Sequence, residues 1–290
     1  MQLSRREFVT MTVAGAACGA GLAAAGRAGR ALSAQDVVDR IKKNLGVEWK
    51  AETVDTFKAG DPATVVTGIA TTALPTLAVL NQAVKAGANL IVTSEPAFYS
   101  RAEKPIPGDP VFAAKHEFIK RHQLVVWRFS EHWRFRKPDP MAQGLADALG
   151  WAKNTAADDA ARVSLPPVPL DRLASHVKQA LHARGGIRVI GDPKLEVRTI
   201  GLLPGNTPIQ AALKVLPSVD AIVAGEVREW ESAEYVRDKV TAGEKKALVL
   251  IGRIVSEEPG MSVCARWLGT IVPEVKATAI AAGDPYWRPL

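Results

Sequence analysis

The chain has 290 residues, of which 47% are hydrophobic and 23% charged, a composition typical of one large globular domain or two modest ones. The formal net charge is +7; residues 1–34 carry four arginines and one glutamate, which leaves +4 for the remainder. Because this mild excess is not gathered into a basic block, nucleic-acid binding is not expected.

Residues 1–34 have the features of a twin-arginine export signal. An Arg-Arg pair at positions 5–6 precedes a weakly hydrophobic run, rich in Ala and Gly, over residues 9–25. A membrane-spanning helix would need about 20 strongly apolar residues, so a permanent anchor is disfavoured. We therefore expect recognition by the twin-arginine export machinery, cleavage after Ala25 or Ala34, and a periplasmic location in a bacterium.

Hydrophobic periodicity after this segment predicts helices that alternate with strands. Ser33 is suited to cap the first helix, and early prolines and terminal glycines mark the bounds of others. In chain order, the first predicted elements are a helix over 34–45, a strand over 63–70, a helix over 74–87, a strand over 88–93, a helix over 111–123, a strand over 124–129 and a helix over 139–150.

A proline-rich stretch at residues 163–170 is the best internal boundary. The elements predicted beyond it are a helix over 170–186, strands near 187–191 and 197–205, a helix over 206–216, a strand over 220–225, a helix over 229–240, a strand over 246–252, a helix over 261–268 and a strand near 275–281. This alternation predicts an α/β fold with largely parallel strands and helices packed outside. The predicted organisation is a signal at 1–34, an N-terminal half at 35–162 and a C-terminal half at 163–290.

Ionisable side chains follow four of the predicted strands. Ligands bind beyond the carboxyl ends of parallel strands, so these side chains should share a cleft. A single charge at a strand end is usually just solvated, but several carboxylates together need a metal ion or arginines to neutralise their repulsion. The four groups are Glu95 in TSEP; Glu131, His132 and Arg134 in RFSEHWR; Glu226, Arg228 and Glu229 in AGEVREWE; and Arg253, Glu257 and Glu258 in RIVSEE.

The order of these motifs, ending in IGRIVSEEPGM, resembles the Nif-three-like family of dinuclear-metal proteins, often labelled GTP cyclohydrolase type 2 homologues. The resemblance covers nearly the whole chain after the signal. It implies two related α/β halves with a metal site between them, and assembly into toroidal hexamers. It implies no established physiological substrate.

Two family motifs lose histidines here. The first is typically Thr-His-His-Pro or Thr-His-Glu-Pro, and the last is Gly-His-x-x-Ser-Glu. Carried over onto this chain, the histidine positions fall on Ser94 and Arg253, whereas Glu95 and Glu257 match the family's acidic ligands.

The middle motif departs in a similar way. Where the family has histidines, RFSEHWR has Ser130 and Arg134, and Glu131 stands at the position of an aspartate. His132 matches a family histidine, and Glu226 keeps the glutamate of the Gly-Glu motif. Carboxylates therefore persist, while most imidazoles are replaced.

The missing imidazoles argue against a tightly held dinuclear centre. Imidazole supplies much of the affinity for ions such as Zn or Fe, and carboxylates alone hold Mg, Ca or Mn more weakly. Arg134 and Arg253 would repel a dication by several kcal/mol at an effective dielectric constant of about 20. We hypothesise a metal-poor site in which guanidinium groups pair bidentately with Glu95, Glu131 and Glu257, either as a structural remnant or as a pocket for an anionic ligand.

Two alternatives remain open. In one, a weakly held divalent cation supports cyclohydrolase- or phosphoesterase-type hydrolysis, with Glu131 or His132 as general base and Arg253 steadying negative charge. In the other, the protein is an oligomeric scaffold without catalysis. The candidate cation ligands are Glu95, Glu131, His132 and Glu257, and the other candidate pocket residues are Ser94, Ser130, Arg134, Asp139, Glu226 and Glu229.

Overall fold

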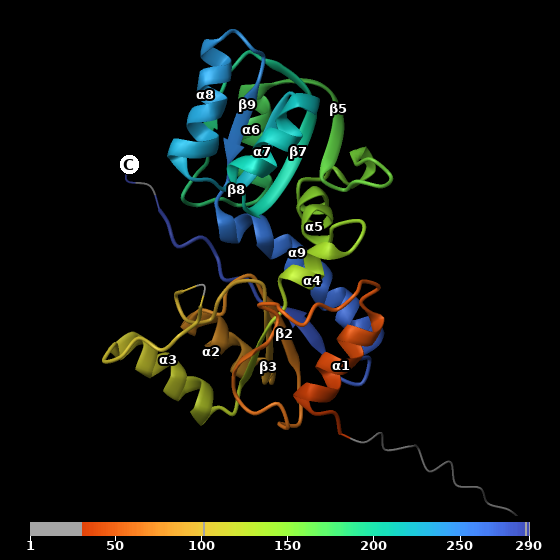
Figure 1. Cartoon of the computed structure of the whole chain (residues 1–290), viewed down its shortest axis with the longest axis vertical. Helices are drawn as coiled ribbons and strands as arrows, with labels where there is room; N and C mark the ends of the chain where they lie inside the picture. Colours follow the sequence, from red (N-terminus) through yellow and green to blue (C-terminus); the bar gives the residue numbers. More distant parts are fainter. Residues whose placement is uncertain (1–30, 101, 288, 290) are drawn as a thin grey trace, which may run out of the picture. The chain divides into compact units, whose positions relative to one another are not determined.

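The computed structural model of the chain describes residues 31–100, 102–287 and 289 (Figure 1). Most of the predicted export signal lies outside the described residues, so that prediction is not tested. From Leu32 onward the chain forms one compact unit. Within the part that the structure describes, no helix has the length and apolar character needed to cross a membrane.

Helices and strands alternate along this unit. The helices are α1 (Ala34–Asn44), α2 (Leu77–Lys85), α3 (Pro110–Arg121), α4 (Glu131–Phe135), α5 (Pro140–Ala148), α6 (Leu170–Ala180), α7 (Ile209–Val215), α8 (Glu234–Thr241) and α9 (Arg253–Ile271), with short helical turns η1 (Ala152–Asn154), η2 (Leu216–Ser218) and η3 (Glu229–Ala233). The strands are β1 (Phe57–Ala59), β2 (Ile69–Thr72), β3 (Leu90–Thr93), β4 (Val125–Arg128), β5 (Arg162–Pro169), β6 (Arg188–Ile190), β7 (Glu196–Asn206), β8 (Ala221–Glu226), β9 (Ala247–Leu250) and β10 (Ala277–Ala279).

The strands form two five-stranded sheets, in the orders β1-β4-β3-β2-β10 and β5-β7-β8-β9-β6. The inner pairings of both sheets are parallel, whereas the edge strands β1, β5 and β6 are antiparallel to their neighbours. Strands β2, β3, β4 and β9 are buried at every residue, as expected for strands with both faces covered. The predicted α/β fold is confirmed, with mixed rather than wholly parallel sheets.

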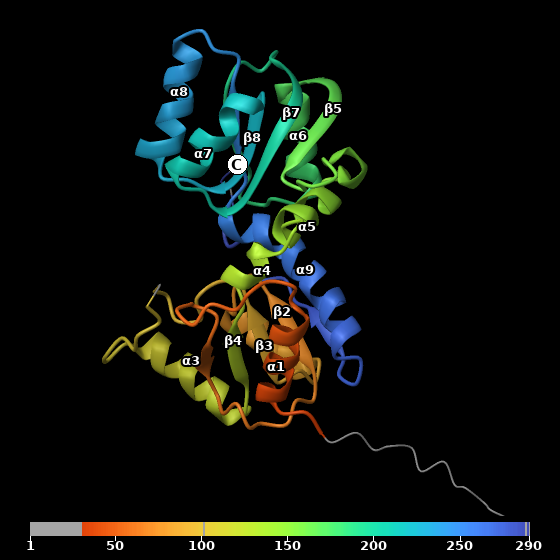
Figure 2. The same cartoon turned by 45° about the vertical axis from the view of Figure 1, so that its right-hand side comes forward.

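Helices cover both faces of each sheet (Figures 1 and 2). In the first sheet, α1 and α9 share one core with the strands, where Val37 and Leu268 pack with Leu90 and Trp127. Helices α2 and α3 cover the other face. In the second sheet, α5 and α6 pack on one face, and α7 and α8 on the other.

Local sequence signals place several helix starts where they were predicted. Ser33 caps α1 in a capping box, because its Oγ accepts from the Asp36 N–H at 3.1 Å while Asp36 accepts from the Ser33 N–H at 2.9 Å. Asp109 and Asp139 cap α3 and α5, each directly before a proline at the first helical position.

Other elements differ from the prediction. The proline-rich boundary is the edge strand β5, where prolines are tolerated because one side of the strand needs no hydrogen bonds. Helix α9 begins at Arg253 and runs through Pro259, well before the predicted start at Met261, because its charged first turns hide the helical period. The strand predicted over 63–70 starts only at Ile69.

The predicted division between residues 162 and 163 stays a prediction, but the two sheets do not follow it. Strand β10, near the C-terminal end, pairs in parallel with β2 and completes the first sheet. Helix α9 contacts strands of both sheets on the way to β10. The last part of the chain therefore ties the two sheets together.

Helices α5 and α9 cross in close contact at two glycines. A Cβ on Gly144 would lie 2.5 Å from the Gly260 backbone nitrogen and 2.6 Å from the Pro259 carbonyl oxygen, closer than side-chain atoms approach in real structures. The crossing brings α9, and the charged groups on its first turns, against the chain that follows β4.

Replacing Gly144 by Ala should lower the free energy of unfolding by roughly 1–3 kcal/mol or more, because the two helix backbones must separate. The matched control is Gly269→Ala, also within a helix, where the added methyl meets nothing within 4 Å. That change should be neutral or stabilise by about 0.5–1 kcal/mol. Urea unfolding measures both; equal effects would show that the crossing tolerates a side chain.

Candidate functional site

The candidate site lies where β3 ends, α9 begins and α4 passes the end of β7. Strand β3 delivers Ser94 and Glu95 directly after its last residue. Helix α9 starts after Gly252, which has the positive φ of 94° that glycine tolerates. Arg253 and Glu257 are four residues apart in this helix and therefore lie on the same face. All four predicted strand-end groups therefore contribute a residue here, counting Arg134 of α4 and Glu226 at the end of β8.

Glu257 is the buried centre of the site, with 1% of its side chain exposed. Its Oε2 accepts a hydrogen bond from Ser94 Oγ at 2.7 Å, and its Oε1 accepts one from Arg134 Nη2 at 2.6 Å. Arg134 Nη1 also donates to the Pro204 carbonyl oxygen at 3.1 Å. A side chain at Gly205 would be strained, because φ is 82° there, and its Cβ would displace the paired ends of Glu257 and Arg134.

A second ion pair joins the neighbouring carboxylate. Arg253 Nη2 lies 2.8 Å from Glu95 Oε2, and its Nη1 lies 3.4 Å from Glu226 Oε2. Burial and the adjacent charge of Glu257 raise the pKa of Glu95 to about 7, and Arg253 opposes this shift. Glu95 and Glu257 are therefore neighbours, and Arg253 and Arg134 each offset the charge of one of them.

The pairing differs from the hypothesised bidentate one. Each guanidinium gives a single nitrogen to its main carboxylate, and Glu226 takes the place expected for Glu131. Glu131 instead accepts from Thr53 Oγ1 at 2.9 Å. Arg134 does form an ion pair with Glu257, and Arg253 with Glu95. The hypothesised neutralisation of carboxylates by arginine therefore agrees with the geometry.

These residues do not fit a dinuclear metal centre. Across the described residues, no three or more His, Cys, Asp or Glu side chains are grouped so that they could hold a metal ion. Both oxygens of Glu257 are engaged by Ser94 and Arg134, and Glu95 faces a guanidinium. A dication placed there would meet two fixed positive charges and no imidazole.

The structure buries His132 completely, against partners outside the ion pairs of Glu257 and Glu95. Its Nε2 accepts from the Lys50 N–H at 2.9 Å, and its Nδ1 lies 2.8 Å from Asp55 Oδ2, which fixes the proton on Nδ1. The ring stacks on Trp49 with centroids 3.8 Å apart. Because both ring nitrogens are engaged, His132 has no free lone pair, which does not fit its expected roles as metal ligand or general base.

Asp55, which sequence reasoning missed, organises this segment. Its carboxylate accepts from the backbone N–H groups of Ser130, Glu131 and His132 at 2.7, 3.1 and 2.8 Å. In the sequence Asp55 is one acidic residue in a loop far from the RFSEHWR motif, so only the fold reveals this contact. Asp55 thereby holds the start of α4 and, one turn on, Arg134.

The remaining candidates have separate surroundings. Asp139 caps α5, and burial raises its pKa against the opposing charge of Arg134. Glu229 forms an exposed ion pair with Arg188 of β6 rather than joining the cluster. Ser130 and Glu131 do line a cavity beside it.

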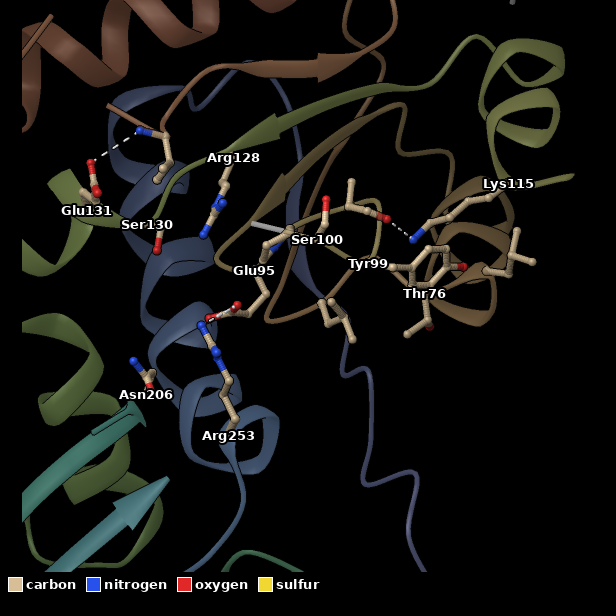
Figure 3. Close-up of a pocket in the computed structure, with 15 residues that line it drawn as sticks. Thr76, Glu95, Tyr99, Ser100, Lys115, Arg128, Ser130, Glu131, Asn206 and Arg253 are labelled. Atoms are coloured by element: carbon tan, nitrogen blue, oxygen red, sulfur yellow. Dashed lines mark hydrogen bonds and ion pairs between the residues drawn. The ribbon is translucent and has the colours of Figure 1, made fainter. Parts of the chain in front are cut away.

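This cavity, of about 620 Å³, opens next to the Glu95–Arg253 pair (Figure 3). Its lining includes three cationic side chains, Lys115, Arg128 and Arg253, together with the carboxylates of Glu95 and Glu131. The rest of the lining consists mainly of small, hydroxyl-bearing and aliphatic residues. A volume of this size suits a small-molecule ligand.

Arg128 and Lys115 are site residues that sequence reasoning missed. Arg128 ends the apolar strand β4 and is buried; its Nε lies 3.3 Å from the Ser94 carbonyl oxygen and its Nη1 3.6 Å from Glu103. An arginine within a strand that is otherwise apolar was an available signal. Lys115 lies within α3, where nothing in the sequence marks it as buried.

Solved structures share this fold over most of the chain. The Staphylococcus aureus hypothetical protein SA1388 has a TM-score of 0.69 at 14% identity, covering 89% of this chain and 99% of its own. A Bacillus cereus protein related to NIF3 has a TM-score of 0.69 at 13% identity, covering 90% and 100%. The protein ybgI, of unknown function, has a TM-score of 0.67 at 18% identity, covering 88% and 100%.

No curated protein matches the chain in a sequence search. The sequence model of the Duf34/NIF3 (NGG1p interacting factor 3) family matches residues 33–284, nearly everything after the predicted signal. The resemblance that the four strand-end motifs indicate is thereby confirmed. The chain belongs to the Duf34/NIF3 family.

Proposed function

We propose that this protein binds a small anionic ligand in a metal-independent pocket, where two arginines take the place of metal charge. The observation that carries the proposal is the direct contact of Arg134 with Glu257 and of Arg253 with Glu95. Both carboxylates match acidic ligands of the family motifs, so the groups that would coordinate metal are already compensated.

Cationic groups beside the cavity support anion binding. Arg253 is the accessible one, with 34% of its side chain exposed, and its Nε has no hydrogen-bond partner among the described residues. Arg128 is more buried, and its Nη1 meets Glu103 only at 3.6 Å, so both guanidinium groups keep hydrogen-bonding capacity. Both arginines line the 620 Å³ cavity, and so do Ser130 and Asn206.

The alternative of a metal-dependent hydrolase has weaker support. Its proposed base, His132, is held by Lys50 and Asp55, and its proposed ligand Glu257 is held by Ser94 and Arg134. Side chains engaged in this way agree better with a binding protein or a pseudoenzyme. We also propose export to the periplasm, on the twin-arginine pattern, and self-association as a hexamer, on the family resemblance.

Metal analysis tests the absence of a tight centre. The purified protein should contain far less than one equivalent of Zn, Fe or Mn per chain, whereas Ser94→His combined with Arg253→His should take up metal, because two imidazoles replace a hydroxyl and a cation. The control, Ser175→His with Arg266→His, adds two histidines at exposed, separate positions. Two tightly held ions per wild-type chain would contradict the proposal.

The Arg134–Glu257 pair should be strongly coupled in stability. Arg134→Met leaves the buried Glu257 carboxylate without its cation and should cost roughly 3–5 kcal/mol of unfolding free energy. Adding Glu257→Gln should recover much of this loss, since the uncompensated charge is removed. Arg266→Met breaks an exposed 3.7 Å pair with Asp147 and should cost no more than about 1 kcal/mol. Additive effects of the Arg134 and Glu257 changes in urea unfolding would argue against the pair as the charge balance.

Anion binding should depend on Arg253. In calorimetric titration with malonate as the probe, Arg253→Gln should weaken binding by roughly ten- to a hundredfold, because a charged hydrogen-bond donor is lost. Arg266→Gln, on the same helix, should leave binding unchanged. Failure of the wild-type protein to bind malonate, phosphate or sulfate would contradict the anion pocket.

A further inference from the structure

Lys115 is a buried amine that the ion pairs of the site do not use. Only 1% of the residue is exposed, and its Nζ donates to the carbonyl oxygen of Ala97. The Nζ lies 5.0 Å from the ring centroid of Tyr99 and 5.7 Å from that of Phe98. Its surroundings are therefore one carbonyl group and two aromatic rings.

The carboxylate that acts on Lys115 from a distance is committed elsewhere. Glu103 pairs with Lys58 at 2.8 Å and with Arg128 at 3.6 Å. Burial lowers the pKa of Lys115 to about 8, with Glu103 opposing the shift. A larger fraction of the amine is thus neutral at pH 7 than for an exposed lysine, and a neutral amine is a nucleophile.

The cavity separates this amine from the guanidinium groups. In Figure 3, Lys115, Tyr99 and Thr76 lie at one side of the cavity, while Arg128 and Glu95 lie nearer its opposite side. Arg253 approaches Glu95 from α9. A ligand that spans the cavity would meet a nucleophile at one end and, at the other, two guanidinium groups that each keep a nitrogen without a hydrogen-bond partner among the described residues.

We propose that the cavity binds an oxo acid, whose carbonyl carbon forms an imine with Lys115 Nζ while its carboxylate pairs with Arg128 and Arg253. The amine nitrogen bonds to the carbonyl carbon, and the carbonyl oxygen takes up protons. That oxygen leaves as water when the carbon–nitrogen double bond forms, so neither oxidant nor reductant is required. The carboxylate contact rests on the proposed anion pocket, whereas the imine depends on Lys115 itself.

Reductive trapping tests the imine. The full chain is treated with succinic semialdehyde, whose four-carbon chain separates the aldehyde from the carboxylate, and with sodium cyanoborohydride at neutral pH; carboxypropylation of each lysine is followed by peptide mass mapping. Lys115 should be labelled at least about tenfold faster than Lys120, an exposed lysine on the same helix, and its rate should saturate with succinic semialdehyde. Lys115→Arg should remove the fast phase, and Lys120→Arg should leave it intact.

The imine and the carboxylate contact have separate readouts. Butanal, which has the same reactive group and chain length but no carboxylate, should label Lys115 several-fold more slowly than succinic semialdehyde, and Arg253→Gln should erase that difference while Arg266→Gln preserves it. If neither aldehyde labels Lys115 faster than Lys120 in the wild-type protein, the imine is overturned, whatever the malonate titration shows. If both aldehydes label Lys115 equally fast, the oxo-acid assignment is overturned, and a lack of malonate binding would then locate the failure in the anion pocket.

Discussion

The structure around the site depends on the compensation of one buried carboxylate, that of Glu257. Removing a charged carboxylate from water costs several kcal/mol unless its oxygens are hydrogen-bonded and a cation lies close. Ser94 satisfies one oxygen and Arg134 the other, so β3, α4 and α9 must keep their places for the charge to be tolerated. The same three elements position cavity-lining residues such as Glu95, Glu131 and Arg253. The geometry of the cavity therefore depends on the charge balance at Glu257.

Close backbone approaches allow side chains from distant parts of the chain to meet. Gly205 leaves room for Glu257 and Arg134 at the end of β7, and its N–H donates to Ser256 Oγ at 2.8 Å. Gly144 and Gly260 let α5 and α9 cross with almost no space between their backbones. Asp55 binds three successive N–H groups and sets the start of α4. Polar contacts and small residues thus hold these elements together.

Part of the site could be predicted from the sequence because its residues follow strands. Glu95, Arg253 and Glu257 stand in motifs whose order points to the family, and the charge of Arg134 and Arg253 argues against metal before any geometry is known. The role of His132 could not be predicted, since its partners Lys50 and Asp55 lie about eighty residues earlier in the chain. A histidine in a motif looks the same whether it faces a pocket or a core.

The sequence by itself determined the α/β class, most helix and strand positions, and the family. These follow from local signals: hydrophobic period, caps and motif order. Only the tertiary structure decided which carboxylate each arginine meets, that β10 joins the first sheet, and that Arg128 and Lys115 face a common cavity. The physical reason is that burial and charge pairing depend on contacts between residues far apart in the chain, which no local pattern encodes.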